Sequence, residues 1–65
     1  MRVQLNGRTI ETSAITLAEL MAEQQIDPRT VATALNGEFV PRSRSASQQL
    51  EAGSQLEILS TMQGG

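Results

Sequence analysis

Apolar and polar residues alternate over three short stretches of this 65-residue chain, the pattern of half-buried β-strands. In the first stretch, Val3 and Leu5 alternate with polar neighbours and are followed by Asn6 and Gly7. Both turn positions tolerate a positive φ, so an Asn-Gly pair at this place predicts a two-residue hairpin loop. The predicted register pairs Arg2 with Glu11, Val3 with Ile10, Gln4 with Thr9 and Leu5 with Arg8, which joins apolar side chains on one face and opposite charges on the other.

Residues 31–40 repeat this pattern around a second turn pair, Asn36 and Gly37. A two-residue loop predicts the pairs Thr33 with Val40, Ala34 with Phe39 and Leu35 with Glu38. Phe39, the only aromatic residue, is then on the face opposite Val40 and partly exposed. The third alternating stretch, 55–60, predicts a final strand with Leu56 and Ile58 facing the core and Leu59 pointing outward.

A helical period separates the two hairpins, and it begins with clear start signals. Thr16 is a candidate N-cap, and Glu19 three residues later completes a capping box. Ile15 before the cap is placed to pack on Leu20 as a hydrophobic staple. Pro28 is expected to end the helix, because proline pushes the preceding residue out of the helical region. We therefore predict a helix over residues 17–26, with its buried stripe on Leu17, Leu20, Met21 and Gln24.

The predicted order is hairpin, helix, hairpin, a polar connection over 42–49 with one short helical turn, and a final strand. This order favours an α+β fold, a mixed sheet of about five strands with one main helix (17–26) packed on one face. The arrangement resembles the β-grasp of ubiquitin-like domains, and the strand order is taken from that resemblance. We expect a single domain over 1–65 with a flexible C-terminal tail, 61–65.

Composition removes most catalytic chemistry. The chain has no Cys, no His and no Lys, which excludes disulfides, thiolate ligands, the usual general base and lysine nucleophiles. Its net charge of −2 and the lack of a basic stripe disfavour nucleic-acid binding. No apolar stretch is long enough for a membrane span, so a cytoplasmic protein without a membrane or nucleic-acid partner is expected.

The sequence ends in Gly64 and Gly65, and at average glycine usage two given positions are both glycine in only about 0.5% of chains. With the other reactive groups excluded, the carboxylate of Gly65 becomes the candidate reactive group. Two residues without Cβ suit a terminus that must enter a narrow active site. Gly64 is then the residue that gives access to it.

A family resemblance rests on four segments of the chain, which are 34–42 (ALNGEFVPR), 50–53 (LEAG), 56–59 (LEIL) and 62–65 (MQGG). Together they resemble the ThiS family of small sulfur carriers in thiamine thiazole biosynthesis. The resemblance extends over essentially the whole chain, and a Gly-Gly tail on a β-grasp domain is specific to carriers and modifiers of this kind. Ser54 departs from it, because the family more usually has Asp after the turn glycine.

The resemblance implies a protein cosubstrate rather than an enzyme. The Gly65 carboxylate would be adenylylated by a ubiquitin-activating-type, ThiF-like adenylyltransferase, converted to a thiocarboxylate with sulfur from a cysteine desulfurase system, and used by a ThiG-like thiazole synthase. An ionised carboxylate is a poor electrophile, so this activation must come first. The chain has no phosphate-binding loop, so it is expected to bind no cofactor, with ATP and Mg²⁺ held by the activating partner.

Other readings remain open. A relative of the small subunit of molybdopterin synthase, a ubiquitin-like protein modifier and a binding-only β-grasp module all fit the residue pattern. Phe39, Leu59 and Met62 form a candidate partner-docking patch, with scattered surface apolar groups as the alternative. Arg42 and Arg44 could meet an acidic partner surface, but a solvated loop is the simpler reading.

Overall fold

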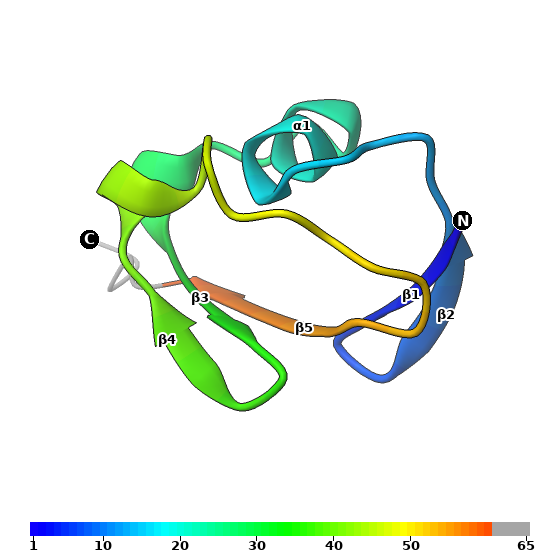
Figure 1. Cartoon of the computed structure of the whole chain (residues 1–65). Helices are drawn as coiled ribbons and strands as arrows, with labels where there is room; N and C mark the ends of the chain where they lie inside the picture. Colours follow the sequence, from blue (N-terminus) through cyan, green and yellow to red (C-terminus); the bar gives the residue numbers. More distant parts are fainter. Residues whose placement is uncertain (61–65) are drawn as a thin grey trace.

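Residues 1–60 are described by the structure, a computed structural model. They form a five-stranded sheet in the order β2-β1-β5-β3-β4, with a helix lying across one face (Figure 1). β5 is parallel to β1, and the other neighbouring strands are antiparallel, so the predicted mixed sheet of an α+β β-grasp fold is confirmed. The strands are β1 (Arg2–Leu5), β2 (Arg8–Glu11), β3 (Val31–Leu35), β4 (Glu38–Val40) and β5 (Gln55–Ser60), with helix α1 (Leu17–Glu23) and the 3₁₀ turns η1 (Pro28–Thr30) and η2 (Arg42–Arg44).

Both hairpins have the predicted registers, including Val3 opposite Ile10 and Ala34 opposite Phe39. The turns have positive φ at both central residues, 52° and 82° in the first turn and 51° and 87° in the second. This type I′ geometry matches the twist of the flanking strands. The Asn-Gly pairs therefore set the register of β1 with β2 and that of β3 with β4.

The core lies between the inner face of the sheet and α1. Leu17 and Leu20 of the helix are fully buried, and Leu56 in the central strand is 1% exposed. Each such side chain contributes about 1.5–3 kcal/mol to folding, so these positions hold the helix on the sheet. The buried apolar set is Val3, Ala14, Leu17, Leu20, Met21, Val40, Leu50, Leu56 and Ile58.

Helix α1 begins as predicted. The Thr16 hydroxyl accepts from the Glu19 N–H at 3.2 Å, and the Glu19 carboxylate accepts from the backbone of Thr16 at 3.4 Å, which completes the capping box. The predicted staple is not supported, because Ile15 is 60% exposed while Leu20 is fully buried. Within residues 1–60, no helix is long and apolar enough to cross a bilayer.

The end of α1 differs from the prediction. The helix stops at Glu23 rather than residue 26, and Gln24, predicted to be on the buried stripe, is exposed. Gln25 has a φ of 59°, and the N–H of Ile26 donates to the Met21 carbonyl at 2.8 Å. These features, with the Gln25 N–H donating to the Ala22 carbonyl, define a Schellman motif. The Schellman motif therefore ends the helix before Pro28 is reached, and Pro28 is the first residue of η1.

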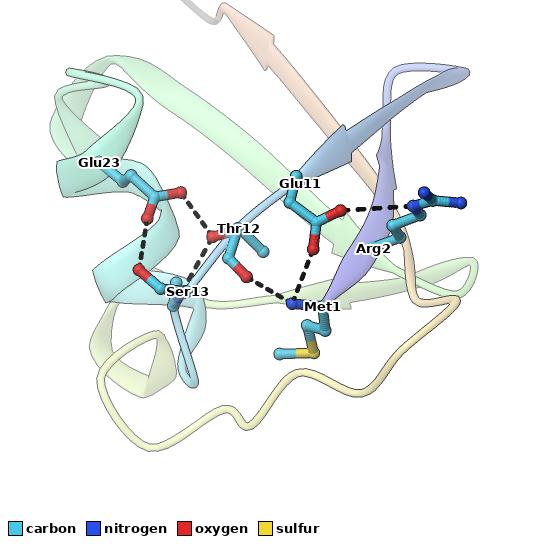
Figure 2. Close-up of polar contacts among 7 residues, drawn as sticks. Met1, Arg2, Glu11, Thr12, Ser13 and Glu23 are labelled. Atoms are coloured by element: carbon cyan, nitrogen blue, oxygen red, sulfur yellow. Dashed lines mark hydrogen bonds and ion pairs between the residues drawn. The ribbon is translucent and has the colours of Figure 1, made fainter.

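A polar cluster ties the first hairpin to the end of α1 (Figure 2). The Met1 amino group donates to the Thr12 carbonyl at 2.7 Å and lies 3.3 Å from a Glu11 carboxylate oxygen. The hydroxyls of Thr12 and Ser13 donate to the two carboxylate oxygens of Glu23. The Thr12 hydrogen bond is the main cause that lowers the pKa of Glu23 below its ordinary value.

Candidate functional site

The candidate site begins where β5 ends. β5 is the central strand, bonded on one side to β1 and on the other to β3, with Ser60 opposite Val31. The predicted site residues Met62, Gly64 and Gly65, with the rest of the predicted tail 61–65, lie outside the described residues. Gly65 is five positions beyond Ser60, so its carboxylate is within about 18 Å of the end of the sheet.

Two turn asparagines hold β5 from both sides. The Asn6 side chain donates from Nδ2 to the Ile58 carbonyl at 3.1 Å and accepts from the Ile58 N–H at 2.8 Å. On the other side, Asn36 Oδ1 accepts from the Gln55 N–H at 2.9 Å. The residue pattern indicates only a turn role for Asn6 and Asn36, and it does not reveal this second role. The choice of Asn in both turns, where Asp or Gly also suits the backbone, was the available signal.

The two described members of the predicted docking patch share the outer face of the sheet, opposite α1. Phe39 is 66% exposed and Leu59 is 64% exposed. They flank β3, with Phe39 opposite Ala34 and Leu59 opposite Ala32. We call Ala32, Ala34, Phe39 and Leu59 the outer-face patch.

The rest of the outer face is polar. On β1 and β2 the outward positions are Arg2, Gln4, Thr9 and Glu11, and the Arg2 guanidinium lies 3.3 Å from the Glu11 carboxylate, the predicted cross-strand ion pair. Apolar exposure on this face is therefore concentrated toward the β3 and β4 side. On this side of the sheet, Val31 of β3 is the register partner of Ser60. The outer-face patch therefore lies next to the end of β5.

Within residues 1–60, no group of three or more acidic, His or Cys side chains is placed to hold a metal ion. The buried hydroxyl of Ser45 donates to the Arg42 carbonyl at 2.8 Å, a structural role. What this part of the molecule provides is a rigid central strand and an exposed apolar surface beside its end.

A mixed five-stranded sheet in this order, with one helix on one face, defines a small β-grasp domain of the ubiquitin-like class. The model of the ThiS family matches residues 3–65, and the chain belongs to the ThiS family. No curated protein matches the sequence.

Two solved structures have the same fold. One is the crystal structure of the thiamine biosynthesis protein ThiS from Geobacter metallireducens, which is 25% identical, has a TM-score of 0.86 and aligns over 100% of both chains. The other is the solution structure of a thiamine biosynthesis protein from the same organism, at 26% identity and a TM-score of 0.80, covering 100% of this chain and 88% of that one.

Proposed function

We propose that this chain is a sulfur carrier protein that supplies sulfur for the thiazole moiety of thiamine. The observation that carries the proposal is its membership in the ThiS family over residues 3–65, which includes the Gly64 and Gly65 tail. The similarity to thiamine biosynthesis proteins of known structure supports it.

In the proposed cycle, the Gly65 carboxylate attacks ATP, pyrophosphate leaves, and an acyl-adenylate forms. A persulfide sulfur supplied by a cysteine desulfurase system then attacks the acyl carbon and displaces AMP. A thiol reduces the acyl disulfide that forms, which leaves a thiocarboxylate on the carrier and a disulfide on the donor side. The resulting thiocarboxylate donates its sulfur to thiazole synthase. The chain acts as a cosubstrate, and the activating adenylyltransferase binds ATP and Mg²⁺, because residues 1–60 contain neither a phosphate-binding loop nor a metal cluster.

In this proposal the folded body has two tasks, to hold β5 fixed and to dock the partner. Hydrogen bonds to both neighbouring strands and the Asn6 and Asn36 side chains restrain β5. The outer-face patch would supply the docking surface, because exposed apolar groups clustered on one face are typical of interaction sites.

Intact mass spectrometry tests the carrier function. The protein, incubated with its activating enzyme, ATP, Mg²⁺ and a sulfur source, should gain about 16 Da, the difference between a sulfur and an oxygen atom. A variant lacking Gly65 is the matched control and should not change in mass. No gain in the intact protein would contradict the proposal, and high-mass adducts on other proteins would instead support a protein modifier.

The docking role of the patch has its own test. Phe39→Ala should weaken binding to the activating enzyme by about tenfold while leaving the melting temperature nearly unchanged, because the side chain is 66% exposed. Thr9→Ala, at an exposed position on β2, is the control and should leave binding unchanged. A large drop in melting temperature with unaltered binding would show that Phe39 is a structural residue.

A further inference from the structure

An open cavity of about 340 Å³ lies at the β3 and β4 side of the molecule, between η1, η2 and the two strands. Its lining includes the apolar side chains of Met21, Val31 and Val40, and Phe39 lines it as well. We call it the β3–β4 cavity. A cavity that opens to solvent and is lined by both apolar and polar groups is suited to receive a side chain from another molecule.

The polar lining is dominated by positive charge. Arg29 and Arg42 line the cavity, and Arg29 donates through Nε and Nη2 to Asp27 at 3.1 and 3.0 Å. The pKa of Asp27 is lowered below its ordinary value, and the hydrogen bond from the Arg29 side chain is the largest cause. Arg42 lies near enough to lower the same pKa further, but it forms none of the ion pairs within residues 1–60. Arg42 is therefore a positive charge at the cavity without an ion-pair partner among residues 1–60.

The backbone that carries Arg42 is well fixed. The Arg42 carbonyl accepts from the Ser45 hydroxyl at 2.8 Å and from the Ser45 N–H at 3.2 Å. Ser45 is itself 6% exposed, so η2 is anchored in the body of the protein. The backbone at Arg42 is therefore held in a defined position at the cavity, so little backbone entropy is lost when the side chain binds a partner.

The cavity is continuous with the surface already proposed for docking. Phe39 and Ala32 belong both to its lining and to the outer-face patch. Val31, also in the lining, is the register partner of Ser60 at the end of β5. A protein that holds the Gly65 carboxylate must reach within about 18 Å of this point, a distance that allows it to contact the cavity.

We propose that the β3–β4 cavity receives an acidic segment of the activating adenylyltransferase, with a carboxylate of that enzyme on Arg42 and an adjacent apolar side chain in the cavity. Arginine is suited to this role, because its planar guanidinium binds a carboxylate through two parallel hydrogen bonds. This inference rests on the proposed carrier function.

The overall charge of the chain adds a reason for specificity. The protein carries a net charge of −2, so the positive charge at the β3–β4 cavity contrasts with the charge of the chain as a whole. Such a contrast orients an approaching partner and penalises wrong orientations. Arg42 would therefore set the direction in which the enzyme meets the tail.

The test compares two charge reversals in the thiocarboxylate-forming assay. Arg42→Glu should raise the KM for the carrier about tenfold and leave kcat nearly unchanged, since the change affects docking rather than the reacting carboxylate. Arg8→Glu, on the exposed edge strand β2, changes the net charge equally and should leave KM within about twofold. Added salt should raise the KM of the intact protein more than it raises the KM of Arg42→Glu.

The outcomes separate this inference from the function on which it rests. If the intact protein gains no mass, the carrier function is contradicted. If the intact protein is modified and both variants have the same KM, the carrier function stands and the role of the β3–β4 cavity is overturned. A melting temperature of Arg42→Glu close to that of the intact protein excludes misfolding as the cause of a raised KM.

Discussion

The side-chain amide of Asn6 pairs with the backbone of Ile58, 52 positions away in the sequence. Its Nδ2 donates to the Ile58 carbonyl at 3.1 Å, and its Oδ1 accepts from the Ile58 N–H at 2.8 Å. The amide thus acts as one more residue of β1 and extends the parallel pairing toward the end of β5. A residue chosen for a positive φ in the first turn also restrains the strand that leads to the proposed reactive terminus.

Replacing the turn asparagines by aspartate separates these roles. Asn6→Asp keeps the turn but loses the donor and places a carboxylate against the Ile58 carbonyl, so it should cost about 1–3 kcal/mol. Asn36→Asp keeps the acceptor used by the Gln55 N–H and should cost less than about 0.5 kcal/mol. Urea unfolding at neutral pH measures both, and equal losses would argue against the two-sided Asn6 contact.

Two leucines of β5 give a matched test of the two sheet faces. Leu56 is 1% exposed on the inner face and Leu59 is 64% exposed on the outer face. Leu56→Ala should cost about 2–4 kcal/mol because it leaves a cavity in the core. Leu59→Ala should cost less than about 0.5 kcal/mol, and thermal unfolding of the two variants gives the comparison. A similar loss in both would show that the outer face is packed.

The Schellman motif predicts a stabilising substitution. Gln25 has a φ of 59° without the freedom of glycine, so Gln25→Gly should raise the free energy of unfolding by about 1 kcal/mol. Gln24→Gly is the control, because Gln24 has a φ of −88°, where glycine relieves no strain. Chemical denaturation should show a higher free energy of unfolding for Gln25→Gly and a lower one for Gln24→Gly.

The capping box predicts a loss at the other end of α1. Thr16→Ala removes the oxygen that accepts from the Glu19 N–H and should cost about 1 kcal/mol. Thr16→Ser keeps a hydroxyl at this position and should stay close to the parent in urea unfolding. If the serine variant loses as much as the alanine variant, the methyl group rather than the hydrogen bond is responsible.

The stability of the protein should depend on pH through Glu23. Its pKa is lowered in the folded protein, first by the Thr12 hydrogen bond, so its stabilising contribution is complete above its unfolded pKa of about 4.3. The contribution is lost as the pH falls through the lower folded pKa. The melting temperature of the intact protein should exceed that of Glu23→Gln near neutral pH, and the gap should shrink as the pH falls below the unfolded pKa. A gap that stays constant would mean that ionisation of Glu23 is not involved.

The local pattern of the sequence was sufficient for both hairpins and for the start of the helix. A two-residue Asn-Gly loop fixes which residues face each other, so the registers of β1 with β2 and of β3 with β4 followed from residue spacing. The capping box connects residues three apart and needs no tertiary contact. The same spacing placed Phe39 and Leu59 outward, as found. Gly65 as the reactive residue came from elimination and family resemblance and stays a prediction.

Tertiary structure decided the features that depend on distant partners. Helix α1 ends three residues before the predicted boundary because Ile26 folds back onto Met21 and packs against the core, a gain that no local pattern displays. The second role of Asn6 requires β5 beside β1, and the β3–β4 cavity requires η1 and η2 to meet beside β3 and β4. Sequence alone determined which residues are neighbours through a turn, because short loops leave few conformations. It did not determine which surfaces meet, because that choice rests on the packing of the whole core.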